Sequence, residues 1–172
     1  MGEIKTHYLY PAALFAHREP YLVNTVLGSC VAICLHDPYL KIGGINHYML
    51  PLWNGQGLAS PKFGNIAIAK LVEKMISMGS RESHLVAKVF GGGNIFDSKL
   101  QQFQIGERNI AIAEQTLSEY NIKIAGSSTG GPLGRKIQFL TSTGEVRQKM
   151  IQKHSPEQNV VEKLACKAGI NN

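Results

Sequence analysis

The sequence predicts an α+β domain built from short strands and core-facing helices. Short apolar and β-branched runs bounded by Gly, Pro, Asn or Asp recur along the chain, and longer segments carry apolar residues at helical spacing. A chain of 172 residues, 44% of them hydrophobic, is long enough for one domain with a substantial core. We therefore expect residues 1–172 to form one domain, with 153–172 as a C-terminal helical extension.

The strands are expected where apolar runs meet turn residues. An opening strand over 7–15 is interrupted by Pro11, and a second extended segment over 21–27 leads into a Gly-Ser turn. Further strands are predicted over 31–35, 41–46, 85–90 and 122–125, followed by a Gly/Ser loop over 126–134 and a closing hairpin over 135–141 and 146–151.

Three helices are expected. The first covers 64–78, where the apolar residues from Ile68 to Ile76 recur at helical spacing and Gly79 provides the stop. The second begins at 105–109 and presents one apolar stripe: Ile110, Ala113, Leu117 and Tyr120. The third lies in the C-terminal extension, where Ser155 is the predicted N-cap.

Composition excludes several classes of protein. The net charge is +6, but the basic residues are scattered along the sequence rather than clustered as in a nucleic-acid-binding stripe. No apolar stretch reaches the eighteen or so residues of a membrane span, and the N-terminus lacks the apolar core of a signal peptide. The three cysteines contain no C-x-x-C pair and predict no disulfide framework. These features favour a cytoplasmic protein.

A cysteine and a histidine stand at the two ends of a predicted hairpin. The strands 31–35 and 41–46 flank the turn residues His36-Asp37-Pro38. Cys30 precedes the first strand, at the end of a flexible Gly-Ser turn, and His47 follows the second.

The register of this hairpin decides whether the two side chains meet. With the symmetry point just after Pro38, Cys34 opposes Gly43 and Cys30 opposes His47. Directly opposed residues have Cβ atoms about 4.5–5.5 Å apart, so this register brings the thiol and the imidazole together on one face. A slip of one residue would separate them.

Such a pair is suited to nucleophilic catalysis. The thiolate is the reactive form of cysteine, and an adjacent imidazole can remove the proton of the thiol. A third polar group that bonds the histidine fixes its tautomer, and either Asn24 or Thr25 could supply it. The backbone N–H groups around Ser29 and Cys30 are candidate donors for an oxyanion hole.

A glycine run at 91–93 follows the strand predicted over 85–90. It lacks the G-K-[ST] ending of a phosphate loop and the G-x-G-x-x-G pattern of a dinucleotide site. A loop that faces a substrate or a protein partner is the better functional interpretation, with Phe96 as an apolar contact.

A zinc site is the alternative use of the same residues. Its ligands would be Cys30 and His47 with Cys34 or His36, a spacing that matches none of the familiar closed zinc sites. Cys30 and Cys34 themselves lie about 13 Å apart in a strand, which is beyond disulfide reach.

Several motifs occur together in this order: Leu27-Gly28-Ser29-Cys30-Val31-Ala32, Asp37-Pro38, Gly43-Gly44, Asn46-His47-Tyr48-Met49-Leu50-Pro51, Phe90-Gly91-Gly92-Gly93, Ile105-Gly106-Glu107-Arg108-Asn109 and Gly130-Gly131-Pro132-Leu133-Gly134-Arg135. With them the chain resembles CheD, the family of chemoreceptor glutamine deamidases of bacterial and archaeal chemotaxis. The resemblance covers about 7–151.

The resemblance implies a fold of two β-sheet layers with helices packed outside, similar to the catalytic domain of cytotoxic necrotizing factor. It implies that Cys30 and His47 hydrolyse selected glutamine side chains on the cytoplasmic helices of methyl-accepting chemoreceptors to glutamate. Thr25 is the expected third catalytic residue. This chemistry requires no metal and no organic cofactor.

The resemblance also implies a protein partner, a CheC-type phosphatase. We assign substrate or partner binding to Ser29, Gly91, Gly92, Asn94 and Phe96. Two alternative functions remain: hydrolysis of glutamyl methyl esters on receptors by the same pair, and a binding module that mainly regulates a CheC-type phosphatase.

Overall fold

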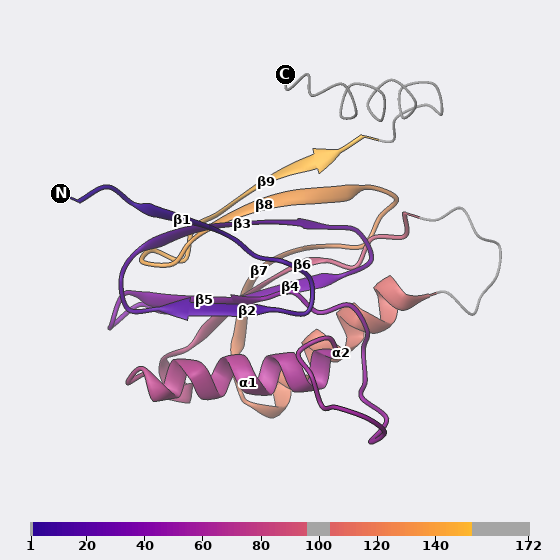
Figure 1. The fold of residues 1–172 in the computed structure, drawn as a ribbon, viewed down its shortest axis with the longest axis horizontal. Coiled ribbons are helices and arrows are strands. Elements are labelled where there is room, and N and C mark those ends of the chain that lie inside the picture. The colour runs from indigo at the N-terminus through magenta and orange to yellow at the C-terminus, as the bar shows by residue number, and fades with distance from the viewer. Residues whose placement is uncertain (1, 96–103, 153–172) are drawn as a thin grey trace.

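The computed structural model describes residues 2–95 and 104–152, and its described part forms two β-sheets and two α-helices stacked in three layers (Figure 1). The predicted α+β sandwich of two sheet layers with helices outside is thereby confirmed. Phe96, Cys166 and the predicted helix at 155–168 lie outside the described residues. No helix in the described ranges is long and apolar enough to cross a membrane.

The first sheet, sheet A, forms one outer layer. Its four strands are β1 (Lys5–Tyr8), β3 (Tyr21–Leu27), β8 (Gly134–Leu140) and β9 (Val146–Ile151), in the order β1-β3-β8-β9. β1 runs parallel to β3, and the other neighbours are antiparallel. The predicted closing hairpin is confirmed as β8 and β9.

The second sheet, sheet B, forms the middle layer. Its five strands are β2 (Leu14–His17), β5 (Ile42–Asn46), β4 (Val31–Asp37), β6 (Val86–Gly91) and β7 (Lys123–Thr129), in the order β2-β5-β4-β6-β7. β4 lies at the centre, so both of its faces are covered, and five consecutive residues from Val31 are buried.

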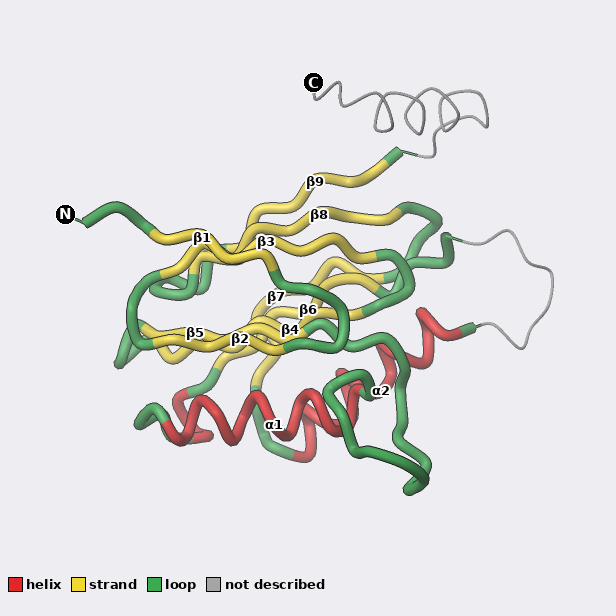
Figure 2. Tube along the Cα trace, in the orientation of Figure 1, coloured by secondary structure: helices red, strands yellow, loops and turns green. Residues whose placement is uncertain are grey.

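Both helices cover the face of sheet B that points away from sheet A (Figure 2). They are α1 (Gly64–Ser77) and α2 (Ile105–Glu119), and a single 3₁₀ turn, η1, spans Glu82–His84. The two predicted helices are confirmed, and the apolar stripe of α1 is buried against the sheet: Ala67, Ile68, Leu71, Val72 and Met75.

The strand alternation of β4 divides the apolar residues between two cores. Odd-numbered residues from Val31 to Leu35 pack with the helices. Even-numbered Ala32 and Cys34 pack between the sheets with residues of β3 and β8. Cys30 lies two residues before Ala32 and also packs against this core between the sheets.

Two strand predictions were wrong. The segment 7–15 is two strands in different sheets, because the chain turns after Pro11 at Ala12, whose φ of 65° is left-handed. The strand predicted over 122–125 continues as β7 to Thr129, because its Gly/Ser segment pairs in parallel with β6 at the edge of sheet B. The Gly/Ser composition of this segment is more typical of a loop than of a strand, and it therefore led to the wrong prediction.

Candidate active site

The hairpin of β4 and β5 exists, but its register differs by two residues from the prediction. Cys34 pairs with Ile45 rather than Gly43. The turn is longer than expected because Asp37 Oδ1 accepts hydrogen bonds from the N–H groups of Tyr39 and Leu40, at 2.9 and 3.1 Å. These bonds shift the symmetry point toward the C-terminus by one residue.

A shift of two residues preserves the face of each side chain, so Cys30 and His47 still share a layer. The backbones of Val31 and Tyr48 exchange two hydrogen bonds of 3.1 and 3.0 Å, in an isolated antiparallel bridge. Cys30 and His47 precede the bridged residues and are diagonal neighbours, a relation that places Cα atoms about 7–8 Å apart. The predicted direct opposition is wrong, and Cys30 and His47 are instead diagonal neighbours on the same face.

Thr25 of β3 reaches His47 across the space between the sheets. Its hydroxyl lies 2.8 Å from His47 Nδ1 and donates to the carbonyl oxygen of Leu9, also at 2.8 Å. A hydroxyl has one hydrogen, so Nδ1 must carry the proton of the imidazole and donate to Thr25. The lone pair of His47 is therefore on Nε2, which is buried and has no hydrogen-bond partner in the described part of the chain.

The environment keeps both reactive groups uncharged. His47 is 1% exposed, and this burial lowers its pKa to about 4, so the imidazole is a neutral base near pH 7. Burial also raises the pKa of the partly exposed Cys30 thiol. The site is thus a neutral thiol beside a neutral imidazole, an arrangement suited to transfer of the proton during attack rather than before it.

The loop between β1 and β2 holds the backbone of His47. The N–H of Ala12 donates to the His47 carbonyl at 2.8 Å, and the His47 N–H donates to the Ala13 carbonyl at 3.1 Å. Ala12 adopts its left-handed φ at this point, a conformation that costs a residue with a side chain about 1 kcal/mol or more. Both the backbone and the ring of His47 are therefore fixed by residues outside the hairpin.

The glycine run packs against the turn that carries Cys30. Gly91 and Gly92 are buried, and the N–H of Gly92 donates to the Cys30 carbonyl at 2.8 Å. A Cβ on Gly91 would lie 2.1 Å from that carbonyl oxygen. Asn94 is exposed at the end of the run. The glycines support the turn that carries Cys30, and their predicted role in binding stays a prediction, as does that of Asn94.

Asn109 belongs to the motif over 105–109, but no role for it was predicted from the sequence. The side chain is fully buried, and its Nδ2 donates to the carbonyls of Ser29 and Met49 at 2.9 and 3.0 Å. It thus joins the turn before Cys30 to the segment after His47. The signal was present in the sequence, because Asn109 lies on the same helical stripe as Ile112 and Ala113.

Arg135 is the second residue of this kind. Arg135 is 1% exposed, and its guanidinium donates to the carbonyls of Ser128 and Gly130 and to the Ser128 hydroxyl. It therefore organises the loop between β7 and β8 from inside the protein. The alternation of Arg135 with Ile137 along β8 placed it on the buried face.

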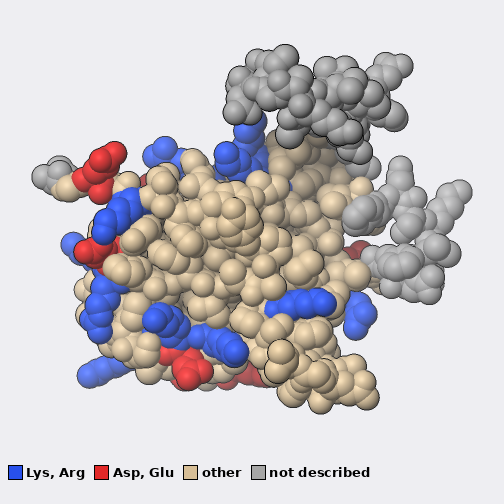
Figure 3. Space-filling view, viewed as in Figure 1, with Lys and Arg blue, Asp and Glu red and all other residues tan. Residues whose placement is uncertain are grey.

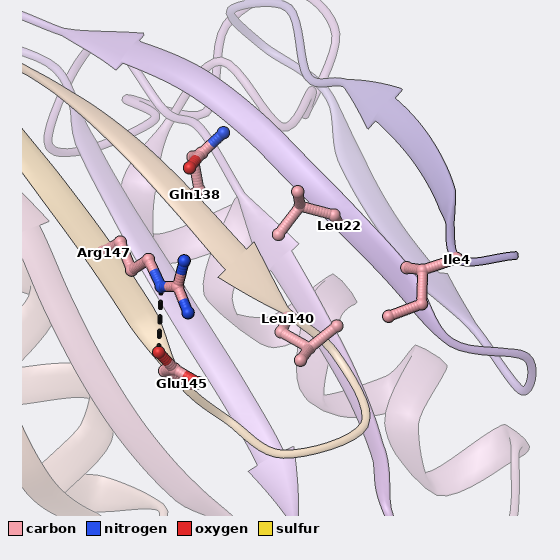
Figure 4. Close-up of a pocket in the computed structure, with 6 residues that line it drawn as sticks. All are labelled: Ile4, Leu22, Gln138, Leu140, Glu145 and Arg147. Atoms are coloured by element: carbon pink, nitrogen blue, oxygen red, sulfur yellow. Dashed lines mark hydrogen bonds and ion pairs between the residues drawn. The ribbon is translucent and has the colours of Figure 1, made fainter.

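Asn24, the other candidate for the third catalytic residue, faces away from His47. Its side-chain oxygen accepts a hydrogen bond of 2.9 Å from Gln138 on the outer face of sheet A. A hollow of about 220 Å³ lies on that face. Figure 4 shows the residues that line it, among them Gln138, and Arg147 with its hydrogen bond to Glu145. The structure thus pairs Thr25, and not Asn24, with the histidine.

The residues of the alternative zinc site do not gather in the structure. His36 lies near the far end of β4, where its Nε2 is 3.1 Å from the carbonyl oxygen of Ser142. Cys34 is in the core between the sheets, and burial raises the pKa of its thiol. In the residues that the structure describes, no three His, Cys, Asp or Glu side chains are grouped to hold a metal ion.

The surface charge agrees with the scattered pattern in the sequence. On the face shown in Figure 3, Lys and Arg side chains are scattered along the top, the left side and across the lower half, with acidic side chains among them. No basic stripe is visible on this face.

Comparison with known proteins places these features in a family. The family model described as CheD chemotactic sensory transduction matches residues 49–150. A relative from Sulfurimonas denitrificans, named probable chemoreceptor glutamine deamidase CheD, is 48% identical over 152 residues, covering 88% of this chain and 97% of the relative. A relative of the same name from Trichlorobacter lovleyi is 48% identical and covers 83% of this chain and 89% of its own.

A solved structure also resembles part of the fold. The crystal structure of the hypothetical protein YfiH of Bacillus licheniformis aligns with a TM-score of 0.41 and 15% identity, over 64% of this chain and 48% of that one. The sequence matches extend over most of both chains and agree with the family model. The chain therefore belongs to the CheD family.

Proposed function

We propose that this protein hydrolyses the side-chain amide of selected glutamines on chemoreceptors to glutamate, with Cys30 as nucleophile and His47 as general base and acid. The printed names of its relatives support the substrate. The observation that carries the mechanism is the hydrogen bond from His47 Nδ1 to Thr25, which leaves the Nε2 lone pair free in the layer that contains the thiol.

The acylation step follows from these positions. His47 Nε2 accepts the proton of the Cys30 thiol as the sulfur attacks the carboxamide carbon, and a C–S bond forms while the carbonyl becomes an oxyanion. The tetrahedral intermediate collapses, the C–N bond breaks, and the imidazolium returns its proton to the leaving nitrogen as ammonia. The product is a thioester between Cys30 and the former glutamine.

Deacylation reverses the roles with water. The neutral imidazole removes a proton from a water molecule that attacks the thioester carbon, and the C–S bond then breaks. The proton returns to the sulfur, which regenerates the Cys30 thiol, and glutamate is released. The N–H groups of Ser29 and Cys30 are the proposed donors to the oxyanion in both halves, each worth about 2.7–4 kcal/mol in a measured case.

Thr25 acts through the histidine. Its hydroxyl oxygen accepts a hydrogen bond from the Nδ1–H group of His47. This bond selects the tautomer with a basic Nε2 and stabilises the imidazolium that forms during each step. Because the Thr25 hydroxyl is itself held by the Leu9 carbonyl, it cannot turn to serve as a competing donor.

Because the proposed substrates are the cytoplasmic helices of chemoreceptors, a cytoplasmic location belongs to the same proposal. We keep a CheC-type phosphatase as the proposed regulatory partner, and Asn94 as an exposed contact near the site. The structure gives no separate support to glutamyl methyl esters as the main substrate, and the same Cys30 chemistry would hydrolyse them.

The test is mass spectrometry of a purified receptor cytoplasmic fragment after incubation with wild type, Cys30→Ala or Cys34→Ala. Cys34 is the matched control, because it lies on the same strand face but is buried in the core between the sheets. We expect the mass gain of an amide-to-acid conversion with wild type and Cys34→Ala, and none with Cys30→Ala.

Conversion by Cys30→Ala would overturn the thiol mechanism. If folded wild type leaves every glutamine unchanged, the deamidase proposal fails. Parallel incubation with a fragment methylated at its glutamates then tests the ester substrate.

A further inference from the structure

Every carbonyl of the nucleophile turn Gly28-Ser29-Cys30 is held by a donor from outside the turn. The N–H of Gly93 donates to the Gly28 carbonyl at 2.9 Å, and the N–H of Gly92 donates to the Cys30 carbonyl at 2.8 Å. The Ser29 carbonyl, between them, receives its hydrogen bond of 2.9 Å from the side chain of Asn109. Two of these three donors are backbone groups, and only the third is a side chain.

The carbonyl bonds fix the direction of the amides. In a planar trans peptide the C=O of one residue and the N–H of the next point in opposite directions. With the Ser29 carbonyl directed at Asn109, the Cys30 N–H points away from α2. The next amide, that of Val31, donates to the Tyr48 carbonyl at 3.1 Å, which fixes the backbone on the other side of Cys30.

In the described part of the chain, the amide N–H groups of Ser29 and Cys30 have no hydrogen-bond acceptor. Within the described residues, no backbone or side-chain oxygen accepts a hydrogen bond from either N–H. The Cys30 N–H belongs to the same residue as the thiol and has no hydrogen-bond partner among the described residues, so it is placed to receive the oxygen of a carbonyl that the thiol attacks.

We infer that Asn109 is a positioning residue that aims the Cys30 N–H at the oxyanion. The inference rests on the proposed function, and it concerns the peptide between Ser29 and Cys30 rather than the thiol. Asn109 is suited to this task because its side chain is fully buried and both Nδ2 hydrogens are used, on Ser29 and on Met49.

The helix end that carries Asn109 is itself fixed. The Tyr48 hydroxyl donates to the Asn109 carbonyl at 2.5 Å, and a Cβ on Gly106 would lie 2.5 Å from the Gly92 carbonyl oxygen. The start of α2 is thus pressed against the glycine turn, and a change at Asn109 leaves these backbone contacts in place. The peptide can then rotate even though the helix stays in position.

The test compares Asn109→Ala with wild type and with Thr116→Val, the control at the other buried polar residue of α2. Two rates are measured: turnover of a receptor fragment, and alkylation of Cys30 by iodoacetamide. Alkylation is a displacement at a saturated carbon, so it uses the thiol and the imidazole but forms no oxyanion. Asn109→Ser, which keeps one hydroxyl donor, replaces the alanine variant if that variant does not fold.

We expect kcat of Asn109→Ala to fall about 10- to 100-fold, somewhat less than the loss of a whole oxyanion donor, with KM nearly unchanged. The alkylation rate should stay within about threefold of wild type, and Thr116→Val should retain both rates. An unchanged kcat in Asn109→Ala, or a parallel fall of alkylation and kcat, would overturn the inference. Failure of the proposed function is distinguished by wild type, which would then show alkylation of Cys30 but no turnover.

Discussion

Replacement of Thr25 by valine tests the tautomer argument most directly. Valine has nearly the shape of threonine, so the core between the sheets stays filled while the hydroxyl is lost. The Thr25 hydroxyl makes two hydrogen bonds in a fully buried position, one to the Leu9 carbonyl and one from His47 Nδ1. The variant leaves one buried acceptor and one buried donor without partners.

The size of the effect follows from these two bonds. A buried group left unsatisfied costs about 1–3 kcal/mol, so with two such groups the free energy of unfolding should fall by about 2–6 kcal/mol. The neutral tautomer with the proton on Nε2 then becomes accessible to His47, and that form cannot accept the thiol proton. Loss of the charged third residue of a protease triad costs about 10⁴ in kcat, and for a neutral hydroxyl we expect about 10².

The assay is deamidation of a receptor fragment at a temperature well below the unfolding transition of the variant. Thr25→Ser is the matched control: it keeps the hydroxyl, and its kcat should stay within about tenfold of wild type. A Thr25→Val enzyme with kcat within about threefold of wild type would refute the role of Thr25 in setting the tautomer.

Four further predictions concern the same site and its neighbours. With the pKa of His47 at about 4, kcat/KM should hold down to about pH 5 and be halved near pH 4; a midpoint near 6.5 in the pH profile would contradict a buried neutral base. The pKa of His47 in the folded protein lies below its value of about 6.5 in the unfolded chain, so about 3 kcal/mol of stability that is present above pH 6.5 is lost as pH falls toward 4. In acid unfolding, wild type should therefore lose more stability over this pH range than His47→Gln. Gly91→Ala should lower both the melting temperature and kcat, because its φ is 108° and the added Cβ meets the Cys30 carbonyl; an unchanged melting curve would show that the turn can move. Asn24→Ala should leave kcat unchanged, since Asn24 bonds Gln138 on the outer face, and a loss of turnover would return Asn24 to the catalytic site.

Much of the fold could be predicted because its elements follow local periodicities. The apolar spacing of the two helices marks one buried face on each, and both helices were predicted correctly from single segments. The errors occurred where a backbone conformation breaks the pattern. The chain turns from sheet A to sheet B at Ala12, whose left-handed φ is not indicated by the residue types around it.

The candidate site shows the same division. The sequence selected Cys30 and His47 from the chemistry of a thiol and an imidazole at the ends of one hairpin. It placed them directly opposite each other because it centred the turn one residue too early. The hydrogen bonds that Asp37 accepts lengthen that turn, and they depend on the side chain taking one of several local conformations.

By itself, then, the sequence determined the types and approximate positions of most elements, the candidate pair Cys30 and His47, and the family resemblance. Only the tertiary structure decided which neighbour serves the pair. Thr25 and Asn24 are adjacent on β3, and their side chains point to opposite faces, so the choice between them depended on which face of β3 packs against sheet B. The same holds for Asn109, whose partners Ser29 and Met49 are far from it in sequence. Local patterns fix the period of an element, but contacts between distant segments form only when whole elements pack.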